Sequence, residues 1–549
     1  MPPGSANFDQ RRLLIAIAIL IPIAFFLRLN SYQLLFEEPR RALVALEMLI
    51  ADNWIVPTTN GELYYNKPPL YNWILIGFMS LLGKAEWVVR LPSILSVFAT
   101  AALHYRISRI YIGTQAALLS ALFYITSADI LFYFSLLGEI DLFFALIVYL
   151  QCMLIFYFYQ QKKWHWLFLS SYLLTSAGLL TKGIPPLFFQ AITLLVIFSQ
   201  NKNWKGLFSF WHFAGILLLA LSSGGYFYLY SLHHDAAPYL ARLFTETFSR
   251  TALEKSLMDN FKHLFNFPVM LIKISAPWCL LFLLTIRAGW RQKINGSPFL
   301  KFCLWFCLAN GLVYLLSPGT RERYLYMFFP FIYSLLAVVL CDKYLAGSNS
   351  WIKRFYLFVG ISVVIGLIGI GIFGAILNSW MPAILCLVLG LIVGYGMIKI
   401  RFANPVNWIL ASVLIILIAR AGFDLVILPT KKQNDPYKKD AFRMSQIVKD
   451  ENVYLVGPPE PKIDELKFAG KHFTTFKKDE PAYLAFQTSF YLSRYTGGIL
   501  KYTTNPTLNN YCISQEKNID PEKVSVFYRF NNRINKEDNW YILYKYKAD

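Results

Sequence analysis

Runs of apolar residues long enough to cross a membrane recur along this chain from Leu13 to Leu428. A helix needs about 20 apolar residues to cross the hydrocarbon core of a bilayer. Hydrophobic residues make up 56% of the sequence and charged residues only 15%, whereas in soluble domains about a quarter of the residues are charged. These features predict an α-helical polytopic membrane protein.

The apolar character of the chain ends near residue 429. From there "PTKKQNDPYKKDAF" begins a stretch that is charged and has no further candidate span. We therefore predict a transmembrane domain over residues 1–429 and a soluble domain over residues 430–549. In the soluble domain, "DPYKKDAFRMSQIVKD" is typical of a helix, and strands are predicted at "NVYLVG", "SFYLSRYTGG", "KVSVFYRF" and "WYILYKYK". This mixture indicates an α/β fold.

The charges between the apolar runs predict on which side of the membrane each loop lies. There are about fourteen candidate runs, but the run at 69–82 is short and begins with prolines, which favours an interfacial or re-entrant helix. With about thirteen spans, every loop on the side of the N-terminus is basic, as the positive-inside rule requires. The N-terminus is then cytoplasmic. The loops at 30–90 and 232–267 and the soluble domain lie on the outer face, which in a bacterial inner membrane is the periplasm.

The first outer loop contains "FEEPRRALVALEML", where acidic and basic residues surround Pro39. Proline is favoured in the first turn of a helix, and carboxylates such as Glu37 and Glu38 are stabilised near a helix N-terminus. The residues that follow form a mostly apolar stripe, which predicts a helix lying on the membrane. Such a helix is either an interfacial anchor whose arginines reach the lipid headgroups or the beginning of an active site.

Ionisable residues in other outer segments favour an active site. They are Lys67 in "YYNKPPLYNW", Glu139 and Asp141 in "LLGEIDLFF", Lys182 in "LLTKGIPP", Glu246 and Arg250 in "LFTETFSRTA", and Arg321 and Arg323 in "SPGTRERYLYMFFP". Arginine and lysine bind phosphate groups, and a carboxylate can accept a proton from an attacking hydroxyl. The outer face is therefore predicted to bind a lipid phosphate and to catalyse transfer from it.

The order of these segments resembles a known family. "FEEPRRALVALEML", "DNWIVPTTNGELYYNKPPLYNW", "VVRLPSILS", "GEIDLFFAL", "GLLTKGIPPL", "TETFSR" and "RYLYMFFPF" look like the GT-C membrane glycosyltransferases of the aminoarabinose lipid A transferase and protein O-mannosyltransferase group. The resemblance implies a GT-C fold, about thirteen spans, a polyprenyl-phosphate sugar donor such as an undecaprenyl phosphate, and an acceptor hydroxyl at the outer face. "TSFYLSRYTGG" is similar to the outer domain of that family.

The resemblance also implies roles for individual residues. Glu37, Asp141 and Glu38 are the catalytic candidates for a single displacement that inverts the anomeric carbon. Glu37 is the expected general base, and Asp141 either shares that role or positions the acceptor. The substrate-binding candidates that the resemblance implies are Arg40, Lys67 and Arg250, and the outer segments themselves add Lys182, Arg323 and Tyr65. Arg321 and Arg323 bind either the phosphate or lipid headgroups. If Glu37 and Asp141 lie close together, mutual repulsion raises one of their pKa values. Two departures from the family, Asn66 in place of a glutamate and "ETFSR" without its histidine, count against aminoarabinose as the sugar and against a metal beside Lys67.

Several alternatives remain open at the level of sequence. The acceptor could be lipid A, another glycolipid, a glycan or a protein. With a protein as acceptor, the chain would be a protein O-glycosyltransferase. A lipid-phosphate transporter or flippase is the rival of another class, although few charges lie within the apolar runs and no internal repeat is present. The sequence identifies no metal ligand and requires no cofactor. Whether the reaction uses a divalent metal stays open.

Overall fold

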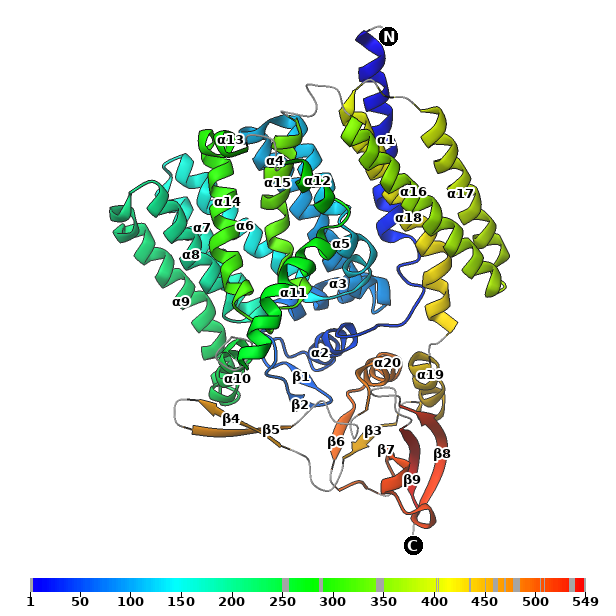
Figure 1. The fold of residues 1–549 in the computed structure, drawn as a ribbon. Helices are drawn as coiled ribbons and strands as arrows, with labels where there is room; N and C mark the ends of the chain where they lie inside the picture. The colour runs from blue at the N-terminus through cyan, green and yellow to red at the C-terminus, as the bar shows by residue number, and fades with distance from the viewer. Residues whose placement is uncertain are drawn as a thin grey trace.

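The structure, a computed structural model, describes residues 3–547 apart from 249–255, 286–289, 342–349, 401, 403, 434–435, 450, 458–462, 469–470, 477–483, 504, 508 and 533–538. Its main body is a bundle of helices, with a smaller sheet domain below it (Figure 1). Helix α2 (Glu38–Ile50) lies across the lower end of the bundle, between the bundle and the sheet domain. The two termini of the chain lie at opposite ends of the molecule.

The bundle side of the molecule is formed by helices from residues 3–433. In chain order they are α1 (Pro3–Phe26), α3 (Leu70–Leu82), α4 (Glu86–Ile125), α5 (Ala128–Phe132), α6 (Ile140–Gln160), α7 (Trp164–Lys182), α8 (Pro185–Gln200), α9 (Phe210–Ser231), α10 (Ala237–Phe248), α11 (Leu257–Ser275), α12 (Cys279–Thr285), α13 (Trp290–Gly296), α14 (Pro298–Leu315), α15 (Phe329–Val339), α16 (Ser350–Ile376), α17 (Trp380–Lys399) and α18 (Pro405–Gln433). Short 3₁₀ turns, η4 (Glu322–Tyr324) and η5 (Tyr326–Phe328), precede α15.

Seven helices in the described part of the chain are long and apolar enough to cross a membrane. They are α4, α6, α9, α14, α16, α17 and the Pro405–Pro429 part of α18. Other predicted spans form helices that are shorter or interrupted: α8 has 16 residues, and α11 is separated from α12 at Pro277. The multi-pass architecture is thus confirmed, while the number of about thirteen spans stays a prediction. The segment at 69–82 forms α3, which at 13 residues is too short to cross a bilayer.

One of the long helices contains two of the predicted runs. Within α4, Gly113 has a φ of 78°, outside the helical range, so the chain breaks there between the runs predicted at 91–105 and 115–133. Glycine adopts this conformation without the steric cost that a side chain would add. The second stretch ends at Ile125, earlier than predicted, and the chain continues into the short helix α5.

The C-terminal domain contains a five-stranded mixed sheet in the order β6-β3-β7-β9-β8. Its strands are β3 (Val453–Val456), β6 (Lys501–Thr503), β7 (Tyr511–Gln515), β8 (Val524–Asn531) and β9 (Trp540–Tyr546). Strand β3 is parallel to both of its neighbours, and β9 is antiparallel to both of its own. The strands predicted at "NVYLVG", "KVSVFYRF" and "WYILYKYK" and the helix α19 (Pro436–Val448) are confirmed. A separate hairpin of β4 (Ile463–Phe468) and β5 (Lys471–Phe476) was not predicted.

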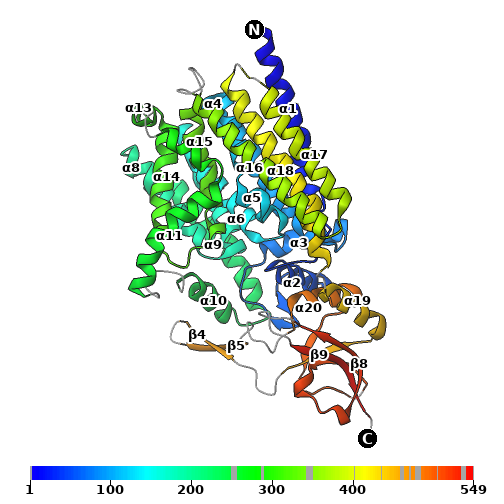
Figure 2. The ribbon, with the colours of Figure 1, turned by 45° about the vertical axis from the view of Figure 1, so that its right-hand side comes forward.

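The strand predicted at "SFYLSRYTGG" is wrong, because this segment forms helix α20 (Phe486–Thr496). Six consecutive residues, 488–493, are buried, since α20 lies between the sheet and α2 (Figure 2). When a helix is covered on all sides, the alternation of apolar and polar residues no longer distinguishes it from a strand. Gly497 ends the helix in a left-handed conformation, with φ of 71° and its N–H bonded to the Ser493 carbonyl.

The prediction that α2 lies on the membrane is also wrong, and of its two interpretations the interfacial anchor does not fit the structure. All but one of its residues from Glu38 to Met48 are buried, because α3 and α4 cover it on one side and α20 on the other. Its apolar stripe belongs to a hydrophobic core that α2 shares with α3 and with the sheet domain. The charged residues of α2 are therefore held inside protein, where each of them requires a partner.

Glu47 illustrates this requirement and positions the loop that leads to Lys67. Its carboxylate accepts hydrogen bonds from the Thr58 hydroxyl at 2.7 Å and from the backbone N–H groups of Asn60 and Gly61. Asn60 and Gly61 form the turn between β1 (Thr58–Thr59) and β2 (Glu62–Leu63), with φ of 53° and 75°. Asn-Gly is the preferred pair for such a turn. The hairpin is thereby fixed to α2.

Candidate active site

Two neighbouring cavities lie at the end of the bundle that faces the C-terminal domain. The first, of about 480 Å³, is bounded by α8, α10, α14 and η4. The second, of about 550 Å³, lies beside Glu37 and the segment that contains Arg321 and Arg323. Thr320 lines both cavities. The predicted ionisable residues are distributed between these two spaces.

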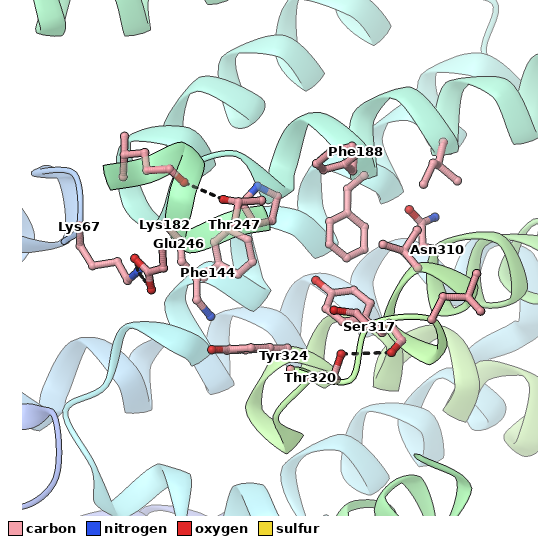
Figure 3. Close-up of a pocket in the computed structure, with 18 residues that line it drawn as sticks. Lys67, Phe144, Lys182, Phe188, Glu246, Thr247, Asn310, Ser317, Thr320 and Tyr324 are labelled. Carbon is pink, nitrogen blue, oxygen red and sulfur yellow. Dashed lines mark hydrogen bonds and ion pairs between the residues drawn. The ribbon is translucent and has the colours of Figure 1, made fainter. Parts of the chain in front are cut away.

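The first cavity is an apolar groove with charged residues at one end. Its walls include Phe188 and Ile192 of α8 and Val313 of α14, whereas Lys67, Lys182 and Glu246 also line it. Figure 3 shows Lys67 and Glu246 together at one end, Asn310 toward the other, and the Phe188 ring between them. Such a space is suited to a ligand with a long apolar part and an anionic head.

Lys67, like Lys182, is a mostly buried lysine that lines this groove. Its ammonium lies 2.6 Å from both carboxylate oxygens of Glu246, and its backbone carbonyl accepts a hydrogen bond from Tyr239 at 2.7 Å. Glu246 and Tyr239 both belong to α10, so this helix closes over the lysine. Burial lowers the pKa of Lys67 to about 7, and Arg41 and Lys182 add to the lowering while Glu246 opposes it. A group with this pKa changes its charge near neutral pH.

Asp141 lies between the two cavities, in the first turn of α6. Its carboxylate binds the ammonium of Lys182, which lines the first cavity, and lies 3.7 Å from Nε of Arg323, which lines the second. Lys182 also lies 4.3 Å from the ring centroid of Tyr324. Asp141 is buried, so these two cations hold its carboxylate in one position. Asp141 is therefore placed to orient Lys182 in the first cavity and Arg323 in the second.

Glu139, the residue before α6, also binds Arg323, at 2.7 Å. It is the carboxyl group of this site whose pKa is raised, and the sequence had not singled it out for that. The sequence suggested Glu37 and Asp141 as the repelling pair. Instead, burial and the neighbouring Asp141 raise the pKa of Glu139 to about 8, against the opposing effect of Arg323. Glu139 is therefore mostly protonated at neutral pH.

Glu37 lines the second cavity at the N-terminus of α2. Its carboxylate is paired with the guanidinium of Arg40 and lies 3.8 Å from that of Arg41. Although burial acts in the opposite direction, these two arginines hold the pKa of Glu37 below its ordinary value. The side chain is 35% exposed, so an ionised carboxylate is accessible from the cavity.

Glu38 is fully buried and lines neither cavity. Its carboxylate accepts hydrogen bonds from Arg90 at 2.8 and 3.1 Å, from the Gly138 N–H at 2.6 Å and from the Leu35 N–H at 2.8 Å. Arg90 in turn donates to the carbonyls of Leu29 and Gln33. This arrangement corrects our placement of Glu38 among the catalytic candidates, because all its contacts serve to hold the loop before Glu37.

Replacing Arg90 with Met is expected to destabilise the protein by about 3–5 kcal/mol, because it leaves the buried Glu38 carboxylate without its cation. The measurement is thermal unfolding of the purified protein in detergent. In the double variant Arg90→Met, Glu38→Gln no buried charge remains, so it should recover part of the loss. A single variant that unfolds at the wild-type temperature would contradict the role assigned to this pair.

The C-terminal domain fixes the same loop from the opposite side. The Tyr491 hydroxyl of α20 accepts a hydrogen bond from the Leu34 N–H at 2.9 Å. Glu86, at the beginning of α4, pairs with Arg494 of α20 and Lys438 of α19. The position of Glu37 therefore depends on residues more than 400 positions away in the sequence.

The structure brings three of the six predicted substrate-binding residues to the two cavities. Lys67 and Lys182 line the first cavity and Arg323 the second, while Arg40 lines neither and instead pairs with Glu37. Tyr65 also lines neither, since its ring packs against Tyr239. Arg250 lies outside the described residues.

Sequence reasoning assigned no role to Arg90 or to Tyr64, whose hydroxyl accepts a hydrogen bond from Arg41. Arg90 could have been found, because an arginine within an apolar helix such as "VVRLPSILS" needs a buried partner. Tyr64 carried no comparable signal.

In the described part of the chain, no group of three or more His, Cys, Asp and Glu side chains is arranged to hold a metal ion. Asn66, the residue that departs from the family pattern, accepts a hydrogen bond from Arg242 at 3.2 Å.

The pKa of Glu139 leads to a prediction about stability. Its folded pKa, about 8, lies above its ordinary value of 4.5, so the folded state holds a proton that the unfolded state releases between these values. The stabilisation from Glu139 is thus complete below pH 4.5 and is lost as the pH rises through 8. Between pH 6 and pH 9 the melting temperature of Glu139→Gln should rise relative to wild type, by on the order of a few degrees. A constant difference across this range would contradict the assignment.

Comparisons with known proteins agree with this geometry. A family model described as dolichyl-phosphate-mannose-protein mannosyltransferase matches residues 66–226. The crystal structure of ArnT from Cupriavidus metallidurans bound to undecaprenyl phosphate superposes with a TM-score of 0.68 and 16% identity, over 96% of this chain and 97% of ArnT. The chain has the GT-C fold. At this identity the likeness shows the fold alone.

Curated relatives extend the resemblance to the sequence. The undecaprenyl phosphate-alpha-4-amino-4-deoxy-L-arabinose arabinosyl transferase of Edwardsiella ictaluri is 25% identical over 63% of this chain. That of Pectobacterium carotovorum is 26% identical over 65% of it. The aligned parts span 61% and 65% of these two relatives' own lengths. The resemblance to the GT-C glycosyltransferases is confirmed, and the apolar helices and bacterial relatives together indicate a multi-pass bacterial inner-membrane protein.

Proposed function

We propose that the chain is a GT-C glycosyltransferase that transfers a sugar from a polyprenyl phosphate to an acceptor hydroxyl. The observation that carries this proposal is the first cavity, where Lys67 and Lys182 lie at the charged end of an apolar groove and Asp141 lies directly behind Lys182. A polyprenyl chain fits the apolar walls, and its phosphate fits the two ammonium groups. Undecaprenyl phosphate is the lipid named for the relatives.

In the proposed reaction the acceptor oxygen attacks the anomeric carbon from the second cavity. The bond from that carbon to the phosphate oxygen breaks, and the lipid phosphate leaves with the electron pair. Lys67 and Lys182 stabilise the charge that builds on the phosphate, as preorganised cations in a buried site do. Glu37 takes the hydroxyl proton. One displacement inverts the configuration of the anomeric carbon.

The other charged residues then act through these groups. Asp141 holds Lys182 and Arg323 in place between the cavities. Arg40, which sequence reasoning assigned to the phosphate, orients the Glu37 carboxylate instead. Glu38 and Arg90 fix the backbone before Glu37. Arg250, which follows α10 after the described residues end at Phe248, remains a proposed phosphate ligand.

The relatives suggest the substrates to test first. Their named sugar is 4-amino-4-deoxy-L-arabinose, and lipid A or another glycolipid is the proposed acceptor. The family model that matches residues 66–226 is named for a protein mannosyltransferase, which keeps a protein acceptor as the second candidate. The proposed orientation places the N-terminus in the cytoplasm and the active site and C-terminal domain in the periplasm.

Mass spectrometry of glycolipids and surface glycans in wild-type and deletion strains tests the proposal. The deletion should lose one sugar increment on an acceptor and accumulate the polyprenyl phosphate donor that carries the same sugar. The mass of the increment identifies the sugar. If the deletion changes neither pool while the gene is expressed in the wild type, the glycosyltransferase function is wrong and lipid transport becomes the next function to assay.

A further inference from the structure

The second cavity contains two exposed aromatic side chains beside the acidic residues. Phe36 and Tyr133 both line it, their ring centroids lie 5.9 Å apart, and the two residues are 60% and 42% exposed. Behind them, Tyr133 packs edge-on against the buried Phe134, which contacts the buried Tyr326. The Tyr133 ring is thus supported from below, and the Phe36 ring, tilted by 55° relative to it, forms a second wall of an aromatic corner in the cavity.

Phe36 is held in a backbone conformation that disfavours a phenylalanine. Its φ is 53°, in the left-handed region, where a bulky side chain costs energy that glycine would not. The other described non-glycine residues with positive φ are arginine, aspartate, asparagine or lysine residues. The bonds from Leu35 and Gly138 to Glu38 enforce this turn. Strain of this kind is typical of functional positions, since it persists only where the surrounding structure maintains it.

The position of the aromatic pair relative to the phosphate site decides which substrate it contacts. In a single displacement the attacking oxygen and the leaving phosphate lie on opposite sides of the anomeric carbon. Lys67 and Lys182 place the leaving phosphate in the first cavity, and Asp141 separates this cavity from the second. The aromatic pair therefore lies on the side of the attacking acceptor, next to Glu37.

We propose that Phe36 and Tyr133 form a platform on which a sugar ring of the acceptor stacks, so that the acceptor is a saccharide rather than a serine or threonine side chain. This inference rests on the proposed glycosyltransferase function. The C–H face of a sugar ring is apolar and packs on aromatic rings, while the hydroxyls at its edge reach toward Glu37. A serine or threonine side chain presents no such face and would leave both rings exposed.

The lining of the cavity distinguishes this platform from an aromatic membrane anchor. Exposed aromatic residues are common where a protein meets the lipid headgroups. Here, however, Glu37, Glu139, Arg321 and Arg323 line the same cavity. An apolar face bordered by hydrogen-bonding groups matches a sugar, which has an apolar face and a polar rim.

Steady-state kinetics of the purified full-length protein test the platform. The donor is undecaprenyl phosphate-linked 4-amino-4-deoxy-L-arabinose, and the acceptors are lipid A, whose head group is a disaccharide, and a threonine-rich peptide. Phe36→Ala and Tyr133→Ala should each raise the KM for lipid A about tenfold and leave the KM for the donor unchanged. Phe36→Trp should retain the wild-type KM. Trp54→Ala, which removes an exposed aromatic of the same outer loop outside both cavities, is the matched control.

Two further measurements separate the platform from a structural role and from the proposed function itself. Phe36→Gly relieves the backbone strain, so its melting temperature should equal or exceed that of wild type although its KM for lipid A rises. In Phe36→Trp, lipid A should change the emission of the introduced indole relative to wild type, whether or not sugar is transferred. If wild type transfers sugar to neither acceptor but this emission change is seen, the proposed function fails with these substrates and the platform stands.

Each of the following results would overturn the platform. The first is an unchanged KM for lipid A in both alanine variants. The second is an increase of the donor KM instead, which would place the donor sugar on the rings. The third is the absence of an emission change with lipid A, or efficient transfer to the peptide that Phe36→Ala does not affect.

Discussion

Replacing Glu37 with Gln is expected to lower kcat for sugar transfer by about 10²–10⁴-fold while the affinity for the polyprenyl phosphate stays near that of wild type. The glutamine keeps the size of the side chain but cannot take the proton of the acceptor hydroxyl, and general base catalysis typically contributes this factor. The phosphate site is unaffected because Glu37 lines the other cavity. Initial rates at saturating donor, with donor binding measured separately, check both parts.

The pH profile identifies which carboxylate is the base. Because Arg40 and Arg41 outweigh burial and hold the pKa of Glu37 below its ordinary value, the acidic limb of the rate profile should lie below pH 4.5. If Glu139 were the base, the rate would instead rise through about pH 8. Glu322→Gln is the matched control, since Glu322 lines the same cavity but pairs with Lys273. Wild-type activity in Glu37→Gln would transfer the role to Asp141.

Much of the fold could be predicted because it depends on local pattern. The apolar runs, the change of composition near residue 429 and three of the five strands of the C-terminal sheet follow from hydrophobicity and periodicity alone. The Glu-Glu-Pro-Arg segment was recognised as the beginning of a helix because proline and carboxylates favour that position. Each of these signals comes from residues that are close together in the sequence.

The pairing of charges could not be predicted, because it joins distant parts of the chain. Lys67 meets Glu246, and Glu139 meets Arg323, over separations of 179 and 184 residues. Glu38 and Glu37 are neighbours in the sequence, yet one is fully buried against Arg90 and the other faces a cavity. Only the packing of α2 between α4 and α20 decides that Glu38 is the buried residue and Glu37 the one in the cavity. For the same reason α2 was predicted to lie on the membrane, since a buried amphipathic helix and an interfacial one have similar patterns.

Removing the charge of Lys67 is expected to abolish most of the affinity for the lipid phosphate. A buried ammonium that binds a phosphate contributes at least about 2 kcal/mol, so Lys67→Met should weaken binding of undecaprenyl phosphate by about 30-fold or more. Because burial lowers the pKa of Lys67 to about 7, the protonated fraction of the free protein falls above that pH. The wild-type affinity should therefore fall as the pH rises, by up to about tenfold per pH unit above 7. Titrations with undecaprenyl phosphate at pH 6, 7, 8 and 9 measure both effects.

Two variants test whether the charge of Lys67 itself is responsible. Lys67→Arg keeps a cation whose pKa lies far above this range, so the fall in affinity that the wild type shows above pH 7 should be absent from this variant. Lys67→Met also removes the ammonium that neutralises the Glu246 carboxylate beside the groove, and this carboxylate would repel a phosphate by itself. Combining Lys67→Met with Glu246→Gln removes this repulsion, and the affinity should still remain well below that of wild type. If the combined variant binds as tightly as wild type, Glu246 controls the binding and Lys67 is not a phosphate ligand.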